Sequence, residues 1–489
     1  MPPVRISSLA GAPEDTAADT RVVCLFDGEA LADPVLQGLV ELGEAKAGLG
    51  KVAVAHEEAP GGGGRRVLVA GMGQRSELDP ERARVAAGAV AARARELGAV
   101  SLSWAVPEGE GLAGAIVEGT LLRLYTFDRF KSDREGSEEG LESLELAGVS
   151  SDDAELQRAR ISAESANAAR DLQNLPSNVA TPAFLADRAV EIAEEHDTLE
   201  VELFDREAIV ARGMGALACV AQGTYAEPRL IVLRYRGPGA AGPHLGFVGK
   251  AVTFDTGGIS IKPASKMHEM KFDMSGGAAV LEAMDGIARL SLPVTITAVV
   301  PATENMPSGR SVKPGDIVTA MNGTTIEVNN TDAEGRLILA DALCYAVEQG
   351  AERIVDLATL TGAVIVALGH THTGLYSNDD DWYAEVARAC DATGEIGWRM
   401  PLHPDYLELT KGKFADLTNA AEARVASSNY AAEFLRQFVD DRPWVHMDIA
   451  GTAWGLSRPY IGKGASGMGT RGLIELARRT AGGGGGPAL

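Results

Sequence analysis

Charged side chains follow three successive apolar segments of the chain, at points where strands are expected to end. The side chains are Lys250, Asp255, Lys262, Asp273, Asp332, Glu334 and Arg336. In open α/β sheets, ligands gather beyond the carboxyl ends of the strands. We therefore expect these carboxylates, lysines and arginine to meet at one edge of a sheet.

Crowded carboxylates repel one another and resist ionisation unless positive charge offsets them. Lysine and arginine could supply that charge alone, as a structural salt-bridge network. The carboxylates could instead hold two divalent metal ions that share bridging oxygens. Gly257-Gly258 and Gly276-Gly277 lie beside the acidic residues, where a close backbone approach would leave room for ions and substrate. The spacing leaves both interpretations open.

The N-terminal part of the chain has the pattern of an α/β domain. Residues 65–73 read as a buried strand, 76–97 as an Ala-rich helix that starts with capping residues, and 99–106 as another strand. The sequence AGMGQR after the first strand lacks the third glycine of a dinucleotide-binding fingerprint. Nucleotide binding is therefore not expected there.

The acidic stretch 131–155 is expected to be an exposed connection that leads into a helix. We place domain boundaries at 1–165 and 166–489. Strands and helices alternate in the second region, and Asn322-Gly323 between apolar runs predicts a hairpin. The expected fold is a smaller N-terminal α/β domain and a larger C-terminal α/β domain, whose mixed, mostly parallel central sheet is covered by helices.

The whole-chain composition narrows the class of protein. Lys and Arg number 45 against 68 Asp and Glu, a formal charge of −23, which disfavours nucleic-acid and anionic membrane partners. The four cysteines are scattered, as in a reducing compartment. Neither a signal peptide nor an apolar run of about 18 residues stands out, so we expect a cytoplasmic protein without membrane contact. The Gly-rich tail 481–489 is expected to be disordered.

Other catalytic signatures are absent from the sequence. HExxH, GxSxG and the P-loop pattern do not occur. His370 and His372 form a pair without a third ligand nearby in sequence, so a metal site there is not expected. We expect His446 to be a buried, hydrogen-bonded residue rather than a ligand.

Five segments resemble the signatures of one family, the leucyl aminopeptidases, which are two-metal cytosolic peptidases. The segments are NTDAEGRL (330–337), VGKAVTFDTGGISIKP (248–263), ENMPSGRSVKPGD (304–316), DLATLTGA (356–363) and DIAGTAW (448–454). The first is long and specific, and the resemblance extends over almost the whole chain. It is weakest in the first 60 residues and in the tail.

The resemblance implies a role for each of the charged residues. The metal ligands would be Lys250, Asp255, Asp273, Asp332 and Glu334, with Asp255 and Glu334 bridging two ions. Lys262 and Arg336 would be the catalytic pair. The substrate pocket would be lined by Met270, Asn330, Thr359, Leu360 and Gly362.

The same resemblance implies hydrolysis of peptides from a free amino end by a hydroxide activated by two metals. Lys262 would stabilise the developing oxyanion, and Arg336 would hold a bicarbonate ion. The ions would be Mn²⁺ or Zn²⁺, with Mg²⁺ also compatible with an oxygen-rich site. Similar enzymes are homohexamers.

Three positions depart from the usual family pattern. Ala251 stands where glycine is common, GASG at 464–467 replaces GATG, and Trp454 is expected to reshape the side-chain pocket.

Two functions other than peptide hydrolysis are considered, a DNA-binding regulator and an inactive scaffold. The −23 charge opposes the first and the presence of both Lys262 and Arg336 opposes the second.

Overall fold

The computed structural model of the chain describes residues 4–59, 62–132, 140–149, 153–423, 425–456 and 458–482. Two compact units are present, Met1–Asn167 with Ser457–Gly462, and Ala168–Leu456 with Lys463–Leu489. No sequence pattern singled out the 457–462 segment as part of the first unit. Most of the predicted disordered tail (483–489) and parts of the predicted acidic connection (133–139 and 150–152) lie outside the described residues. The prediction of an exposed connection is wrong for Ser143–Ala147, which form a strand with Leu144, Leu146 and Ala147 buried, because this strand pairs with a neighbouring strand on each side.

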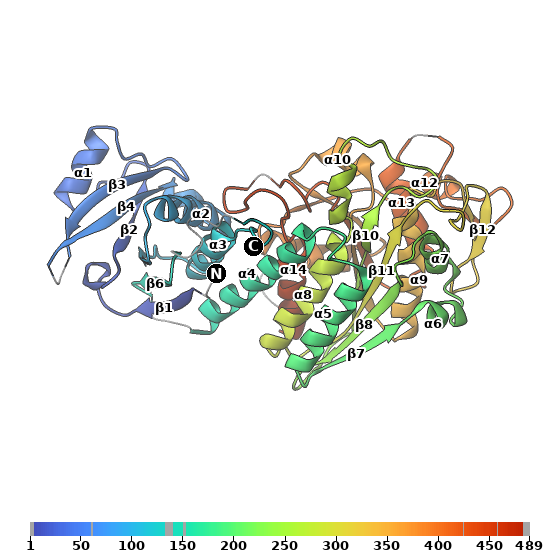
Figure 1. Cartoon of the computed structure of the whole chain (residues 1–489). Coiled ribbons are helices and arrows are strands. Elements are labelled where there is room, and N and C mark those ends of the chain that lie inside the picture. The colour runs from blue at the N-terminus through green and yellow to red at the C-terminus, as the bar shows by residue number, and fades with distance from the viewer. Residues whose placement is uncertain are drawn as a thin grey trace. The chain divides into compact units, whose positions relative to one another are not determined.

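The first unit is built on a six-stranded sheet in the order β1-β6-β5-β2-β4-β3 (Figure 1). Its elements are β1 (Arg5–Leu9), β2 (Thr20–Phe26), α1 (Pro34–Glu41), β3 (Val52–Glu58), β4 (Gly64–Gly73), α2 (Pro80–Glu96), β5 (Ser101–Ala105), α3 (Leu112–Leu124), β6 (Ser143–Ala147) and α4 (Asp153–Asn174). All neighbouring strands pair in parallel except β3 and β4. The predicted strand–helix–strand pattern is β4–α2–β5, with β2 lying between the two strands.

Local chemistry explains why α2 begins where it does. Pro80 occupies the first turn, and the Asp79 side chain accepts a hydrogen bond from the backbone N–H of Arg82 at 2.8 Å. Proline is tolerated at this position because a backbone N–H in the first turn has no acceptor within the helix, so its absence costs no hydrogen bond. The aspartate side chain accepts from one of the remaining first-turn N–H groups. The helix therefore starts a few residues after the predicted position.

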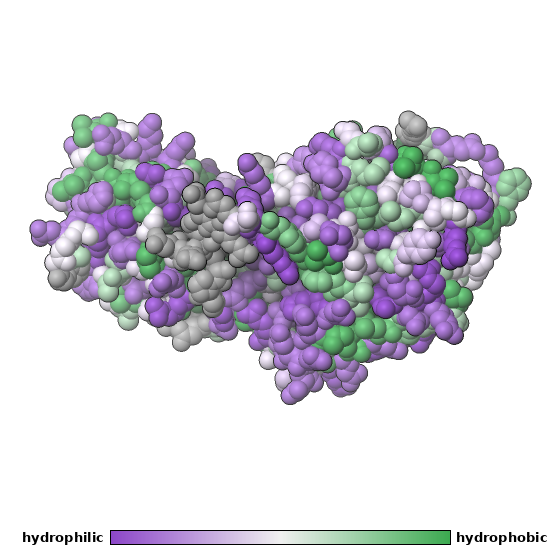
Figure 2. Space-filling model, in the orientation of Figure 1, coloured by the Kyte–Doolittle hydropathy of each residue, from purple (hydrophilic) through white to green (hydrophobic). Residues whose placement is uncertain are grey.

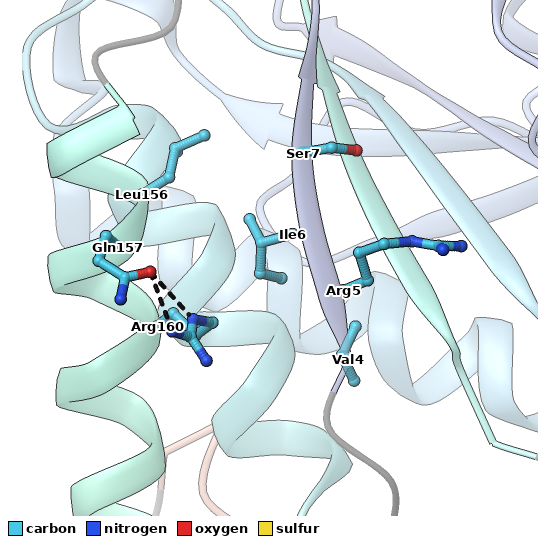
Figure 3. Close-up of a pocket in the computed structure, with 7 residues that line it drawn as sticks. All are labelled: Val4, Arg5, Ile6, Ser7, Leu156, Gln157 and Arg160. Carbon is cyan, nitrogen blue, oxygen red and sulfur yellow. Dashed lines mark hydrogen bonds between the residues drawn. The ribbon is translucent and has the colours of Figure 1, made fainter.

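A cleft of about 480 Å³ lies in this unit between β1 and α4. Ile6 points toward α4, whereas Arg5 and Ser7 point to the other side of the strand, and Gln157 accepts hydrogen bonds from Arg160 (Figure 3). None of the predicted site residues lines this cleft, and its lining includes no carboxylate. It is therefore not the candidate site.

The second unit contains most of the helices and a nine-stranded sheet. Its elements are α5 (Pro182–Glu195), β7 (Leu199–Phe204), α6 (Arg206–Ala211), α7 (Gly215–Val220), β8 (Arg229–Arg236), β9 (Leu245–Gly249), β10 (Ala251–Asp255), η4 (Met267–Phe272), α8 (Ser275–Arg289), β11 (Thr295–Asn305), β12 (Asp316–Thr319), β13 (Thr325–Val328), α9 (Glu334–Glu348), β14 (Arg353–Ala358), α10 (Gly362–Leu368), β15 (Thr373–Ser377), α11 (Asp380–Ala392), β16 (Gly397–Arg399), α12 (Pro404–Glu408), β17 (Leu417–Thr418), α13 (Ser427–Arg436), β18 (Trp444–Asp448) and α14 (Thr470–Ala481).

The nine-stranded sheet runs β16-β15-β18-β14-β9-β11-β8-β7, with β10 also paired to β11. The pairs β15–β18, β11–β8 and β7–β8 are antiparallel, and the others are parallel. Helices α5 and α8 cover one face and α6, α7 and α9 the other (Figure 1). The predicted α/β class, with a mixed and mostly parallel sheet covered by helices, is confirmed.

The core between the sheet and α9 consists of aliphatic and aromatic side chains. Leu337, Ile338 and Leu343 of α9 pack with Val248 and Val299 of the central strands, all nearly fully buried. Burying one such side chain contributes about 1.5–3 kcal/mol. The visible surface over α5 is hydrophilic by contrast (Figure 2). The first turn of α9, which carries Glu334 and Arg336, is therefore anchored by a rigid core.

The predicted hairpin at Asn322-Gly323 is present, joining β12 and β13 as an antiparallel pair. Gly323 has φ +88°, the left-handed conformation that glycine adopts easily. The strand before Asn330 was expected to end at the main sheet edge. Instead, β13 belongs to a separate three-stranded sheet, β12-β13-β17, because its partners are the hairpin strand and a short segment at Leu417–Thr418.

No helix in the described parts of the chain combines the length and apolar character needed to cross a bilayer. The four cysteines carry free thiols, of which Cys219, Cys344 and Cys390 are buried.

Candidate metal centre

The charged residues meet where strands β9, β10, β11 and β14 end. Lys250 interrupts the strand between β9 and β10, both of which pair with β11. Its backbone N–H donates to the carbonyl of Leu357 at 3.0 Å, and its carbonyl accepts from the N–H of Gly277 at 2.7 Å. Asp255 is the last residue of β10. The interruption therefore fixes Lys250 to both β14 and the first turn of α8.

Two of the carboxylates lie at helix N-termini. Asp273 immediately precedes the N-cap of α8, and Glu334 is the first residue of α9. The positive end of a helix dipole favours negative charge at this position. The folding of these helices thus brings two anionic groups to the sheet edge and partly stabilises them there.

Lys250 bridges two of these carboxylates. Its Nζ lies 2.8 Å from Asp273 Oδ2 and 2.8 Å from Glu334 Oε1, and it donates to the carbonyl of Thr359 at 3.0 Å. Asp273 Oδ1 also accepts a hydrogen bond from the Thr359 hydroxyl at 2.6 Å. All four residues are buried.

Lys262 bridges the other two carboxylates. Its Nζ lies 2.7 Å from Asp255 Oδ2 and also contacts Asp332 Oδ1. The Lys262 side chain is 21% exposed and that of Asp332 is 32% exposed, whereas Asp255 is buried. This half of the centre is therefore the one that solvent reaches.

Backbone conformation delivers Lys262 to this position. Gly257 and Gly258 have φ +85° and +64°. A Cβ at Gly257 would lie 2.8 Å from Asp332 Oδ1, and one at Gly258 would lie 2.8 Å from Asn305 Oδ1. Both the conformation and the lack of space require glycine here, as the sequence suggested for the close approach of backbone to this site.

The charges in the centre do not balance. Oxygen atoms of Asp255, Asp273 and Glu334 lie within 4.8 Å of one another. With Asp332, four carboxylates face the ammonium groups of Lys250 and Lys262. Asp273 Oδ2 is buried and receives no well-directed hydrogen bond from any described residue, although the Lys250 ammonium lies close to it. Further positive charge would be stabilised here.

The pKa values show the same imbalance. Burial raises the pKa of Asp273 to about 8, with Lys250 opposing the rise and the carboxylates of Asp255 and Glu334 adding to it. Burial also raises the pKa of Asp332 and of Glu334. Burial by itself would lower the pKa of Lys250, but the surrounding carboxylates outweigh it and the pKa lies above its ordinary value. Oxygen donors and one amine in such a setting fit divalent cations.

Arg336 lies two residues after Glu334, on the first turn of α9. It is buried, its Nη1 donates to the carbonyl of Asn419 at 2.7 Å, and its guanidinium lies 5.1 Å from the centre of the Tyr430 ring. Its Nε has no hydrogen-bond partner among the described residues. Burial lowers the pKa of Arg336. The guanidinium therefore keeps donor capacity for a planar anion.

The predicted pocket residues differ in how directly they join the centre. Thr359 contacts both Lys250 and Asp273, as described above. The Asn330 side chain accepts from the N–H of Asp332 at 2.9 Å. Met270 is half-buried in η4, and its carbonyl accepts from the N–H of Asp273 at 3.3 Å.

Leu360 and Gly362 are held near the centre only indirectly. Asp448 accepts hydrogen bonds from the N–H of Leu360 at 3.1 Å and from the Thr361 hydroxyl at 2.7 Å. Gly362 is exposed at the start of α10, and no hydrogen bond joins it to the charged residues within the described structure. Of the departures from the family pattern, Trp454 stacks on Phe272 of η4 with ring centres 5.6 Å apart.

Sequence reasoning missed several polar residues that support the centre. These are Asn305, Thr331, Asn419 and Asp448. Asn305, Thr331 and Asp448 stand inside segments that carried the family resemblance, whereas Asn419 does not. A search for buried polar residues at strand ends would have found Asn305 after the apolar run of β11 and Asp448 after that of β18.

Among the described residues, the other histidines and acidic groups do not form a comparable centre. His446 is buried and hydrogen-bonded to Asp356 at 2.6 Å, as expected. His370 bonds the carbonyl of Gly451 through Nδ1 at 2.7 Å. Glu195, His196 and Asp285 also lie close together, but Asp285 already pairs with His196 at 2.9 Å and with Arg289 at 3.5 Å.

Comparison with known proteins places these residues in a family. Residues 167–474 match the catalytic domain of the cytosol aminopeptidase family, and residues 23–134 match its N-terminal domain. The probable cytosol aminopeptidase of Solibacter usitatus is 46% identical over 469 residues, which cover 94% of this chain and 96% of the relative. That of Roseiflexus castenholzii is 44% identical, covering 97% and 99%.

A solved structure agrees with these relatives in fold. The bottromycin maturation enzyme BotP, solved in complex with Mn, is 31% identical with a TM-score of 0.86, covering 95% of this chain and 100% of its own. The family match spans well over half of the chain, and both domains are represented. The chain therefore belongs to the cytosol aminopeptidase family and is a metal-dependent aminopeptidase.

Proposed function

We propose that this aminopeptidase releases amino-terminal residues, leucine among them, at the centre formed by Lys250, Asp255, Asp273, Asp332 and Glu334. The observation that carries the proposal is the pair of lysine ammonium groups, each bridging two carboxylates. A salt-bridge network would match charge with charge, whereas here the carboxylates exceed the lysines. The excess is what a site for two dications requires.

The five residues would hold two divalent ions, which would supply Lewis-acid activation of water. Mn²⁺ is supported by the Mn complex of the similar BotP, and Zn²⁺ and Mg²⁺ are compatible with the donor set. Lys250 must lose its proton to act as a ligand, so metal loading should release protons. Asp255 and Glu334 would be the carboxylates shared by the two ions, because their oxygens lie within 4.8 Å of each other and both contact the Asn305 amide.

Lys262 and Arg336 would act on the substrate. The partly exposed ammonium of Lys262 is suited to stabilise negative charge that develops on the scissile carbonyl oxygen. The planar guanidinium of Arg336, with an unpartnered Nε among the described residues, is suited to hold a bicarbonate ion that moves a proton. Both groups hold their charge next to carboxylates without being ligands.

Substrate selection would follow from the same arrangement. A free α-amine would approach the carboxylate centre, which explains action at the amino end only. Met270, Asn330, Thr359, Leu360 and Gly362 would line the pocket for the first side chain. Peptides with a blocked amino group would lack the group that this centre attracts.

We extend the proposal to the setting of the enzyme. A homohexamer in the cytoplasm, with domains at 1–165 and 166–489, is in keeping with the family and with the names of the relatives. The −23 charge argues against nucleic acid as a partner. Light scattering of the purified chain would give its subunit number directly.

The test is hydrolysis of Leu-p-nitroanilide after dialysis against chelator, before and after addition of Mn²⁺ or Zn²⁺. Activity should return with metal in the wild type and stay at least about a hundredfold lower in Lys262→Ala, as for loss of one oxyanion donor. Lys313→Ala is the matched control, since Lys313 is exposed and pairs only with Asp316 in the described structure. Equal activity of the two lysine variants would contradict the role of Lys262.

A second assay separates amino-end recognition from general peptide hydrolysis. Leucine p-nitroanilide and its N-acetyl derivative differ only at the amine. The acetylated compound should not be hydrolysed by the metal-loaded enzyme. Hydrolysis of both at similar rates would exclude recognition through a free amine.

A further inference from the structure

Asn305 is a buried side chain that touches two of the carboxylates at once. It is the last residue of β11, and its side chain is 2% exposed. Its Nδ2 lies 2.8 Å from Asp255 Oδ1, 3.4 Å from Glu334 Oε2 and 3.0 Å from the carbonyl oxygen of Thr331. One amide nitrogen thus faces three oxygen acceptors.

The chemistry of these neighbours defines the orientation of the amide. All three neighbours are acceptors, so the NH₂ group and not the carbonyl oxygen must face them. Oδ1 then faces Gly258, where a Cβ would approach it to 2.8 Å. The backbone carbonyl of Asn305 accepts from Thr256, at 3.1 Å from N–H and 2.7 Å from the hydroxyl. Every part of the residue therefore contacts the loop or the ligands.

Asn305 contacts the carboxylate oxygens that the two lysines do not contact. Lys262 contacts Asp255 through Oδ2, and Lys250 contacts Glu334 through Oε1. The amide nitrogen contacts the opposite oxygen of each residue. Asp255 is therefore held by a cation on one oxygen and by the amide on the other. The two N–H groups of the amide serve three acceptors, and the contact with Glu334 is the longest, so the amide restrains Asp255 more strongly than Glu334.

We propose that Asn305 is a positioning residue that holds Asp255 and Glu334 in the orientation required to bind metal. This inference rests on the proposed function of the carboxylate centre. A neutral donor between two like charges lowers their repulsion without competing as a cation does. Asn305 pairs with Asp255 in the register of β10 and β11, so the donor stands on the strand next to one of the carboxylates that it contacts.

The third contact extends this role to the adjacent loop. Thr331 O accepts from Asn305, while the Thr331 hydroxyl donates to Gly257 O at 2.6 Å and accepts from Ser260 N at 2.8 Å. The loop carrying Lys262 is thus tied to the same strand end. Groups that orient metal ligands typically change metal affinity by about 10–100-fold when removed.

The test measures metal binding rather than activity alone. Metal-free wild type, Asn305→Ala and Asn305→Ser are titrated with Mn²⁺ by calorimetry, and kcat and KM for Leu-p-nitroanilide are then taken at saturating Mn²⁺. Asn305→Ala should bind Mn²⁺ about 10–100-fold more weakly, with kcat reduced and KM little changed. Asn305→Ser keeps one short donor and should recover part of the affinity.

Asn378→Ala provides the matched control. Its amide also makes two hydrogen bonds to backbone, donating to Arg442 O at 3.0 Å and accepting from Trp444 N at 2.9 Å, but neither partner is a metal-site carboxylate. Circular dichroism of the metal-free proteins measures folding and melting temperature. The control should lose stability and keep the Mn²⁺ affinity of the wild type.

The possible outcomes separate the two proposals. Wild-type Mn²⁺ affinity and kcat in a folded Asn305→Ala variant would overturn the role of Asn305 and leave the proposed function intact. Should that variant not fold, the same result in Asn305→Ser, whose single short donor cannot reach both carboxylates, would overturn it. Weakened Mn²⁺ binding in the variant would support the role even if the wild type did not hydrolyse leucine substrates. A wild type that binds no divalent ion would overturn both proposals.

Discussion

Two buried charged clusters lie in the same unit, and they differ in how their charges are balanced. In the first, four carboxylates face Lys250 and Lys262, as described above. In the second, Asp356 of β14 accepts from Trp444 Nε1 at 2.6 Å and pairs with His446 Nδ1 at 2.6 Å. One carboxylate there accepts from an indole N–H on one oxygen and lies against an imidazole nitrogen on the other.

The difference is the one that we expect between a structural cluster and a metal-binding one. Burial by itself would lower the pKa of His446, but the neighbouring Asp356 outweighs it and raises the pKa. Both oxygens of Asp356 therefore have a partner within the protein. In the carboxylate centre, burial raises the pKa of Asp273, Asp332 and Glu334 despite two nearby lysines. Such a site would be stabilised by further positive charge.

The largest expected effect is the loss of activity on metal removal. Exhaustive chelation should lower the rate of Leu-p-nitroanilide hydrolysis by about a thousandfold, since metal ions contribute several kcal/mol to the transition state. The measurement is the initial rate before and after chelation, with far-UV circular dichroism as the control for folding. If the metal-free protein kept its full rate, the carboxylate centre would have a structural role only, like the Asp356–His446 cluster.

The second prediction compares one substitution in each cluster in the metal-free protein. Asp356→Asn should lower the free energy of unfolding by about 3 kcal/mol, because it removes the partner of a fully buried histidine. Asp332→Asn should change it by less than about 1 kcal/mol, because Lys262 keeps Asp255 as a partner. Urea denaturation of both variants measures the difference. Equal losses in the free energy of unfolding would show that the charges are balanced in both clusters.

The third prediction concerns stabilisation by metal. At a free Mn²⁺ concentration of about one hundred times Kd, wild type should gain roughly 2.7 kcal/mol of stability by mass action. At the same free Mn²⁺ concentration Asp332→Asn should gain less, and Asp356→Asn should gain as much as the wild type. Thermal melts with and without Mn²⁺ give the comparison. If the stabilisation by Mn²⁺ disappeared in Asp356→Asn, the ion would bind at the Asp356–His446 cluster and not at the carboxylate centre.

The smallest expected effect is a pH dependence of the metal-free protein. Burial raises the pKa of Asp273 to about 8 in the folded state, above its ordinary value near ~3.9. The folded state therefore favours the protonated form. Its stabilising contribution is complete below about pH 4 and is lost as pH rises through about 8.

The corresponding measurement is the melting temperature between pH 5 and pH 8.5 with and without Mn²⁺. The metal-free protein should lose stability across this range, and Mn²⁺ should reduce the loss because a bound dication favours the ionised ligands. Asp273→Asn should flatten the metal-free profile. A melting temperature of the metal-free protein that rises with pH over this range would contradict an excess of negative charge in the centre.

Much of the fold could be predicted because its signals are local. The apolar run before Asn305, the alternation of strands and helices, and Asn322-Gly323 all specify elements through spacing and turn chemistry. The assignment of β13 to a separate sheet was not predictable in this way. Its pairing with Leu417–Thr418 joins segments about ninety residues apart, and no local sequence signal in either segment indicates which strand it pairs with.

The sequence by itself determined which chemical groups are available in the centre and which family the chain resembles. Residue types such as Lys250, Asp255 and Glu334, with their neighbouring glycines, follow directly from the order of amino acids. Spacing alone could not choose between a salt-bridge network and a metal site. That choice depends on distances between groups on different strands.

Only the tertiary structure decided how these charges are shared. It brings Lys250 between Asp273 and Glu334, Lys262 beside Asp255, and the Asn305 amide against the remaining oxygens. These contacts require strands and helices distant in sequence to pack around one sheet edge. Electrostatic energies depend steeply on distance and burial, so they are defined only once the chain has folded.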